Sequence, residues 1–127
     1  MSDVLYINKQ SFIVSSAVTE AEQMRGLMFA IPPFEPMIFV YAQPKINKFW
    51  MQNVIAPLDI VFCLNNKISN VCHGQPNSTS LIGNDELSDL VIELPYGTCE
   101  KMGIKKGDDV YVNLSKNTMI KVFSQKL

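Results

Sequence analysis

The stretch Phe49-Trp50-Met51-Gln52-Asn53-Val54-Ile55-Ala56-Pro57-Leu58-Asp59-Ile60-Val61-Phe62 decides the fold of this 127-residue chain. It is almost wholly apolar and holds the only tryptophan, yet Asn53 and Asp59 lie inside it. Because Pro57 cannot donate a ladder hydrogen bond, the stretch predicts a strand over residues 49–52, a bend, and a second strand over 58–64. A buried polar group without a partner costs roughly 1–3 kcal/mol or more. Asn53 and Asp59 are therefore expected either to bond backbone groups at the bend or to belong to a site.

The segments around this stretch predict further short strands, because apolar and β-branched residues occur there in runs bounded by turn residues. The runs lie at residues 4–7, 12–14, 37–41, 67–72, 89–94, 109–114 and 118–123. Asn65-Asn66 suits a two-residue hairpin turn, since asparagine tolerates positive φ. Residues 115–117 are expected to join a terminal hairpin.

Two short helices are also expected. Thr19 and Glu22 stand at capping-box spacing at the start of a helix over residues 19–25, and Gly26 suits its C-terminus. Thr98 is the candidate N-cap of a second helix over residues 99–102. The chain therefore predicts a mainly β fold in a single domain over residues 1–127, either an antiparallel β-sandwich or a distorted barrel with two short helices.

The composition argues against several classes of protein. Hydrophobic residues make up 47% and charged residues 18%, which suits a packed core and not a disordered chain. The net charge is -1 and no block of like charge occurs, so we expect no nucleic-acid partner. No segment approaches the roughly 18 apolar residues of a membrane span, and no signal-peptide pattern opens the chain. Three cysteines, an odd number, favour free thiols and a cytoplasmic location.

Four landmarks occur in order along the chain: Arg25-Gly26-Leu27-Met28, Phe49-Trp50-Met51-x-Asn53 leading into Pro57-Leu58-Asp59-Ile60, Glu93-Leu94-Pro95-x-Gly97, and Gly103-Ile104-Lys105-x-Gly107-Asp108. With them, roughly residues 12–112 resemble the domain of unknown function 192 family, an uncharacterised group from bacteria, archaea and some phages. The resemblance implies a small β-rich fold and no established activity. It also leaves open a location in a virus particle.

The candidate ligand-binding residues are Trp50 and the polar residues of these landmarks, Asn53, Asp59 and Glu93. Two carboxyls and an amide could meet a ligand in one cleft, where different surroundings would divide acid and base roles between the carboxyls. Alternatively, they bond backbone groups at the bend near Pro57 and at the strand end after Glu93. Trp50 is either an aromatic platform beside Asn53 or part of the core.

The cysteines and the single histidine do not form a metal-binding pattern. Cys72 and His73 are adjacent, so on a strand they face opposite sides, and no CxxC occurs. No metal ligand and no cofactor is therefore expected. Cys99 at a helix start, with His73 as base, would be a possible nucleophile, but a packed thiol is the expectation for Cys99 and Cys63. No catalytic residue is assigned.

Three functions from different classes fit these observations. The first is a non-catalytic binding or accessory module that holds a protein partner or a small ligand. The second is a structural, assembly or decoration subunit of a larger particle, possible for a family that includes phage members. The third is a small hydrolase or lyase that uses Asp59 and Glu93, with Asn53 orienting the substrate. The absence of a nucleophile–base pair favours the first, and an enzyme is not the expectation.

Overall fold

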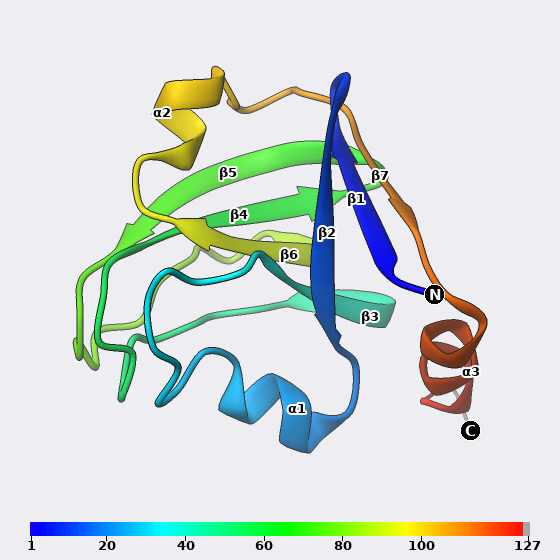
Figure 1. The fold of residues 1–127 in the computed structure, drawn as a ribbon, viewed down its shortest axis with the longest axis horizontal. Coiled ribbons are helices and arrows are strands. Elements are labelled where there is room, and N and C mark those ends of the chain that lie inside the picture. Colours follow the sequence, from blue (N-terminus) through cyan, green and yellow to red (C-terminus); the bar gives the residue numbers. More distant parts are fainter. Residues whose placement is uncertain (126–127) are drawn as a thin grey trace.

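The computed structural model describes residues 1–125 and shows a seven-stranded sheet with three short helices (Figure 1). The strands are β1 (Asp3–Ile7), β2 (Gln10–Ala17), β3 (Met37–Ile46), β4 (Leu58–Leu64), β5 (Lys67–Gly74), β6 (Leu87–Pro95) and β7 (Val110–Asn113). The helices are α1 (Glu20–Arg25), α2 (Thr98–Met102) and α3 (Lys116–Ser124). The strand order is β5-β4-β6-β3-β2-β1-β7, and every pair is antiparallel except β2 with β3.

The sheet curls until its two edges meet at one end. The backbone N–H of Ile68 in β5 donates to the carbonyl of Asp108 at 2.9 Å, and that of Val110 in β7 donates to Asn66 at 2.9 Å. Lys67 and Asp109 form a β-bridge in the same place. The fold is therefore a half-barrel, which confirms the mainly β prediction in its barrel form. No helix among residues 1–125 is long and apolar enough to cross a membrane.

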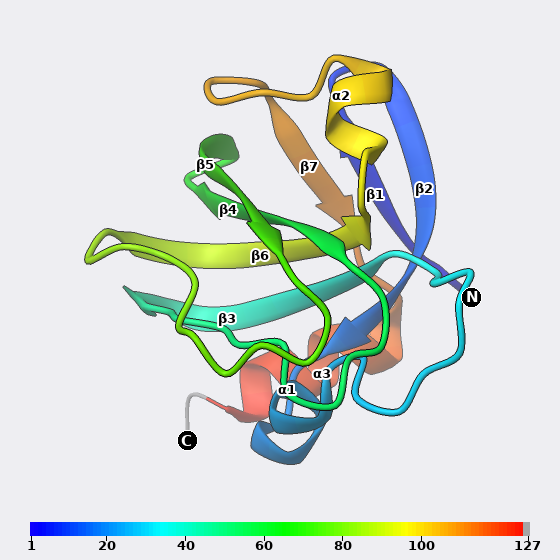
Figure 2. The same ribbon diagram turned by 90° about the vertical axis from the view of Figure 1, so that its left-hand side faces the viewer.

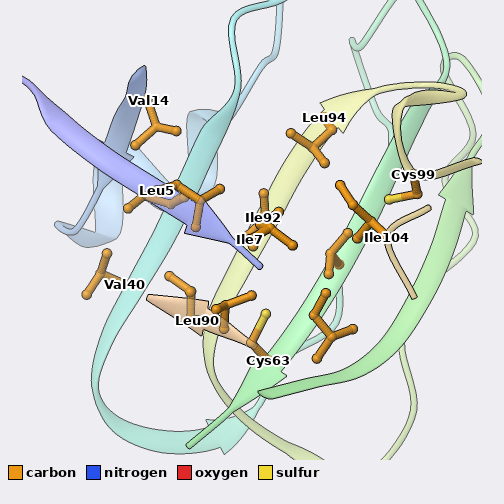
Figure 3. Close-up of a cluster of buried hydrophobic side chains, with 14 of the residues drawn as sticks. Leu5, Ile7, Val14, Val40, Cys63, Leu90, Ile92, Leu94, Cys99 and Ile104 are labelled. Carbon is orange, nitrogen blue, oxygen red and sulfur yellow. The ribbon is translucent and has the colours of Figure 1, made fainter. Parts of the chain in front are cut away.

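The central strands β4 and β6, and the first half of β3, are buried on both faces. On β4, Val61 and Cys63 point into the curl, whereas Ile60 and Phe62 point to the opposite side. Figure 3 shows the inner cluster, which includes Leu5 of β1, Ile92 of β6 and Cys99 of α2. On the other side of the sheet, a second hydrophobic cluster combines strand residues such as Ile60 and Phe62 with Leu27, Phe34 and Met51 of the connecting segments. Burial on both faces explains why the sequence of β4 is a continuous apolar run instead of an alternating one.

Two predicted strands are absent. Residues 118–123 belong to α3, so the expected terminal hairpin and the count of two helices were wrong. Ser115 caps this helix by accepting a hydrogen bond from the Thr118 N–H, which a strand would not provide. Residues 49–52 form no strand either, because only Phe49 makes a bridge, to Ile82, before a turn begins at Met51.

The other local predictions hold with one change. The α1 capping box of Thr19 and Glu22 is confirmed, and Asn65-Asn66 adopts positive φ in the β4–β5 hairpin. The second helix starts at Thr98, but Thr98 is not its N-cap. Its hydroxyl donates to the Pro95 carbonyl instead, and Gly97 takes the N-cap position.

Asp3 joins the beginning of the described chain to α3. Its carboxylate accepts hydrogen bonds from the Ser16 hydroxyl at 2.6 Å, the Ser115 N–H at 2.6 Å and the Thr118 hydroxyl at 2.7 Å. Burial alone would raise the pKa of Asp3, but these hydrogen bonds together lower it. The carboxylate therefore stabilises the docking of α3 above the pKa of the unfolded chain.

Replacing Asp3 with Asn is expected to lower the free energy of unfolding by about 1–3 kcal/mol, because hydrogen bonds to a buried charge are lost. The amides of α3 should exchange faster with solvent than in the wild type, which hydrogen exchange measures. Asp85→Asn, which removes only an exposed ion-pair partner of Lys48, is the control. Equal protection of α3 in both variants would contradict this role of Asp3.

Candidate ligand-binding site

A pocket of about 300 Å³ lies between α1, β3, the segment after β3, and β6. We call it the Glu93 pocket. In both views α1 lies below β3, on the side of the sheet away from α2 (Figures 1 and 2). The Glu93 pocket is lined by Gln23, Met24, Arg25, Gly26, Leu27, Met28, Phe39, Tyr41, Lys45, Ile46, Asn47, Lys48, Phe49, Trp50, Gln52, Val54 and Glu93. Residues from three of the four family landmarks therefore meet in one place.

Glu93 forms the base of this pocket. It lies on β6 opposite Ile60 of β4 and Met37 of β3, so it faces the second hydrophobic cluster. Its side chain is 3% exposed, and its Oε1 atom is buried with no hydrogen-bond partner among residues 1–125. Burial raises the pKa of Glu93 to about 8. The group is therefore mainly a neutral carboxylic acid at pH 7, able both to donate and to accept a hydrogen bond.

Aromatic rings surround this acid. Phe39 and Tyr41 are two residues apart on β3 and so share a face with each other. Phe39 packs edge-on against Phe49, with ring centroids 4.8 Å apart. Burial, and next the charge of Glu93, raise the pKa of the Tyr41 hydroxyl. Trp50 is 44% exposed, which makes it the accessible ring of the set.

Helix α1 is held over the pocket by its own side chains. The Gln23 amide donates to the carbonyls of Ala17 at 3.3 Å and Val40 at 3.2 Å, joining α1 to β2 and β3. Gly26 follows the helix with φ of +48°, where a side chain would be strained. A Cβ atom at Gly26 would lie 3.3 Å from Phe39 Cζ and 3.7 Å from Glu93 Oε1. A side chain at this position would therefore crowd the Phe39 ring and contact the acid.

Three basic residues line the pocket. Lys48 forms an ion pair with Asp85 at 3.0 Å. The Lys45 ammonium lies 5.1 Å from the centroid of the Tyr41 ring. Arg25 is exposed and has no ion-pair partner among residues 1–125. At neutral pH the charge around the pocket is therefore positive.

Asp59 lies on the opposite face of the sheet from Glu93. It pairs directly with Leu94, while Ile60 pairs with Glu93, so the two carboxyls point to opposite sides. The two residues do not share a cleft, and the arrangement predicted for a two-carboxyl enzyme is not formed. Paired carboxyls with divided acid and base roles therefore have no basis in this geometry.

The fully buried Asp59 carboxyl has two partners. Oδ2 accepts a hydrogen bond from the Cys99 N–H in the first turn of α2 at 2.9 Å. Oδ1 lies 2.8 Å from Nδ1 of His73, whose side chain is 53% exposed and packs against Tyr96. Asp59 therefore caps α2 in place of Thr98, a partnership that the sequence did not reveal. A second pocket, of about 220 Å³, lies beside this pair.

The other candidate residues predicted from the sequence do not all lie in one place. Trp50 and Glu93 share the first pocket, whereas Asn53 is not among the residues lining it. Asn53 has φ of +62° in a turn, and its carbonyl accepts the Phe29 N–H at 2.8 Å. The backbone conformation of Asn53 accounts for its position, since asparagine tolerates this conformation. Among residues 1–125 the Asn53 side chain makes none of the backbone hydrogen bonds that were predicted at the bend.

The cysteines are not poised as nucleophiles. Burial, followed by the charge of Asp59, raises the pKa of the Cys99 thiol to about 12. Cys63 is fully buried, and burial raises its pKa as well. Among residues 1–125 no group of three or more histidine, cysteine, aspartate or glutamate side chains could hold a metal ion.

Comparison with known proteins gives a family and no activity. The model of the DUF192 family, described as "Uncharacterized ACR", matches residues 4–112. A protein of unknown function from Novosphingobium aromaticivorans matches in crystal structure with a TM-score of 0.80 and 31% identity, over 85% of this chain and 83% of that one. A candidate transcription regulator from Sinorhizobium meliloti matches with a TM-score of 0.79 and 26% identity, over 87% of this chain and 92% of that one. No curated protein matches the sequence.

Replacing Glu93 with Gln is expected to flatten the pH dependence of stability. The pKa of Glu93 rises from its ordinary 4.5 to about 8 on folding, so the folded chain holds a proton that the unfolded chain releases between these values. Wild-type stability should therefore fall as pH rises from 5 to 8, by up to about 1.4 kcal/mol per pH unit. Urea unfolding at several pH values measures this slope.

The exposed variant Glu35→Gln is the matched control and should keep the wild-type slope. If Glu93→Gln keeps that slope as well, Glu93 is not the group responsible, and its neutral state in the folded protein is wrong.

Replacing Asp59 with Ala is expected to destabilise the protein by about 1–3 kcal/mol or more, because the buried Cys99 N–H loses its acceptor. Replacing the half-exposed His73 with Ala should cost less, since water can replace its hydrogen bond. Thermal unfolding of the two variants makes the comparison. A larger loss in His73→Ala would contradict the capping role of Asp59.

Proposed function

Because the chain belongs to the domain of unknown function 192 family, which has no assigned activity, we propose from its geometry that it is a non-catalytic module that binds a small ligand in the Glu93 pocket. The observation that carries this proposal is the unpaired, buried Oε1 atom of Glu93 at the base of an open, aromatic-lined pocket. Pockets that combine apolar walls with few convergent polar groups are the usual form of small-ligand sites.

The energetics of Glu93 support a ligand. A buried polar group without a hydrogen bond costs about 1–3 kcal/mol of stability, and a leucine or methionine in its place would avoid that cost. A ligand that supplies the missing hydrogen bond would offset the cost in the bound state. Natural sites often keep such destabilising groups because binding requires them.

The aromatic residues support the same site. Trp50 is large and 44% exposed, so a ligand that covers its ring would remove a considerable apolar area from water. The rigid contacts of Phe39 and Phe49 would hold the wall in place before the ligand arrives. A wall that is ordered in advance lowers the entropic cost of binding.

The other functional hypotheses have weaker support. The carboxyls of Asp59 and Glu93 face opposite sides of the sheet, so this geometry does not support the hydrolase or lyase hypothesis. No specific observation favours an assembly subunit or a protein partner over a small ligand. The related protein from Sinorhizobium meliloti is described as a candidate transcription regulator. With a net charge of -1, this chain lacks the basic composition typical of nucleic-acid binding.

We also propose that the protein works in the cytoplasm. Its three cysteines are all free, and Cys63 and Cys99 are buried, as in proteins of reducing compartments. Fractionation of the producing cell tests the location, and recovery from the culture medium or from purified virus particles would contradict it.

A fragment screen tests the small-ligand proposal directly. Fragments of neutral, acidic and basic aromatic compounds are added to the ¹⁵N-labelled protein, and Trp50 fluorescence is recorded in parallel, since this is the only tryptophan. We expect hits to shift the amides of Gly26 and Phe39 and to change the fluorescence. Trp50→Ala should weaken their affinity tenfold or more, measured by calorimetry.

Ile55→Ala is the control for that variant, because Ile55 is 53% exposed and does not line the pocket. A screen without hits, or hits that map only to His73 and Tyr96 on the other face, would overturn the proposal.

A further inference from the structure

We propose that the Glu93 pocket selects organic anions, with the carboxylate or phosphate of the ligand at Arg25 and Lys45 and an uncharged hydrogen-bonding group against Glu93. This inference rests on the proposed function, because it assigns a chemical class to the ligand of the same site. It follows from the distribution of charge between the edge of the pocket and its base.

The basic side chains supply the attraction for an anion. Arg25 is exposed and has no acidic partner among residues 1–125, so its guanidinium is available for a bidentate contact with a carboxylate or phosphate. Lys45 stands over Tyr41 and also has no acidic partner in that part of the chain. Among the described residues that line the pocket, Glu93 is the only acidic one. A negatively charged ligand is therefore favoured on approach.

The base of the pocket requires a neutral group. Glu93 is mainly protonated at pH 7, and desolvation is the sole cause of its raised pKa, so the basic residues at the edge do not hold it ionised. The titratable and charged groups around it are Tyr41 and Lys45 of β3, Lys48, and Arg25 of α1. Tyr41 stays protonated because its own pKa is raised. A protonated carboxyl matches a primary amide or a similar donor–acceptor pair.

The opposite choice, a cationic ligand, fits less well. It would have to ionise Glu93 at a site where burial opposes the charge. It would also have to pass Arg25 and Lys45, which repel it. The two choices predict opposite responses to pH, because ionisation of Glu93 weakens binding of an anion and strengthens binding of a cation.

The experiment uses probes of one shape that differ in charge. 4-Carbamoylbenzoate is the anion, terephthalamide is the neutral analogue and 4-(aminomethyl)benzamide is the cation, and all three carry an amide for Glu93. At pH 6.5 we expect the benzoate to bind at least tenfold more tightly than the other two, measured by Trp50 fluorescence and calorimetry. 4-Carbamoylphenyl phosphate, tested in parallel, distinguishes a preference for phosphate from one for carboxylate.

Variants assign the selectivity to residues. Arg25→Gln and Lys45→Gln should each reduce the preference for benzoate over terephthalamide several-fold. Lys9→Gln, an exposed position outside the pocket, should leave it unchanged. Between pH 6.5 and 9 the wild type should lose affinity for the benzoate severalfold. Glu93→Gln, which keeps an amide donor and acceptor and cannot ionise, should show no such loss.

The outcomes separate this inference from the proposal it rests on. Equal or tighter binding of the neutral or cationic probe means that ligand binding stands and anion selectivity is wrong. Failure of the benzoate and the phosphate to bind, while other fragments bind in the pocket, also overturns the selectivity. Failure of every probe together with an empty fragment screen overturns both.

Discussion

Burial of the central strands on both faces is the constraint on which the rest of the structure depends. The curl of the sheet covers one face of β4, β6 and β3, and the long connections that precede β3, join β3 to β4 and join β5 to β6 cover the other. A polar side chain in the buried part of these strands, such as Asp59 or Glu93, is therefore shielded from water. The positions of α1 and α2, on opposite sides of the sheet, follow from the two faces that need covering (Figure 2).

Asp59 and Glu93 show the two possible results of this constraint. Asp59 is fully enclosed, and α2 and the neighbouring strand provide an N–H and an imidazole as partners. Glu93 is almost as deeply buried on the other face, and its Oε1 atom has no hydrogen-bond partner among residues 1–125. The architecture alone thus explains the Asp59 carboxyl, whereas the buried Glu93 carboxyl lowers the stability of the fold. The difference in hydrogen-bond partners therefore distinguishes the structural residue, Asp59, from the candidate binding residue, Glu93, more clearly than the degree of burial does.

Much of the fold was predictable because its signals are local. The capping box at Thr19 and the Asn65-Asn66 turn depend on neighbours within a few residues, and both were correct. Several of the errors involve partners that are far apart in the sequence. Helix α3 depends on Asp3, more than a hundred residues away, and the separation of Asp59 from Glu93 depends on the register of β4 against β6. Side-chain alternation within one strand cannot supply that register.

The hydrogen bonds of Asp3 also connect the N-terminal strand β1 to the C-terminal helix α3, which in turn contacts α1. Asp3 holds the start of α3, and Lys121 of α3 forms an ion pair with Glu22 of α1 at 3.0 Å. Gln23, the next residue of α1, fastens the helix that forms the roof of the Glu93 pocket. Both ends of the described chain are thus linked mechanically to the pocket. Asp3 and Lys121 therefore contribute to the position of this roof although neither residue lines the pocket.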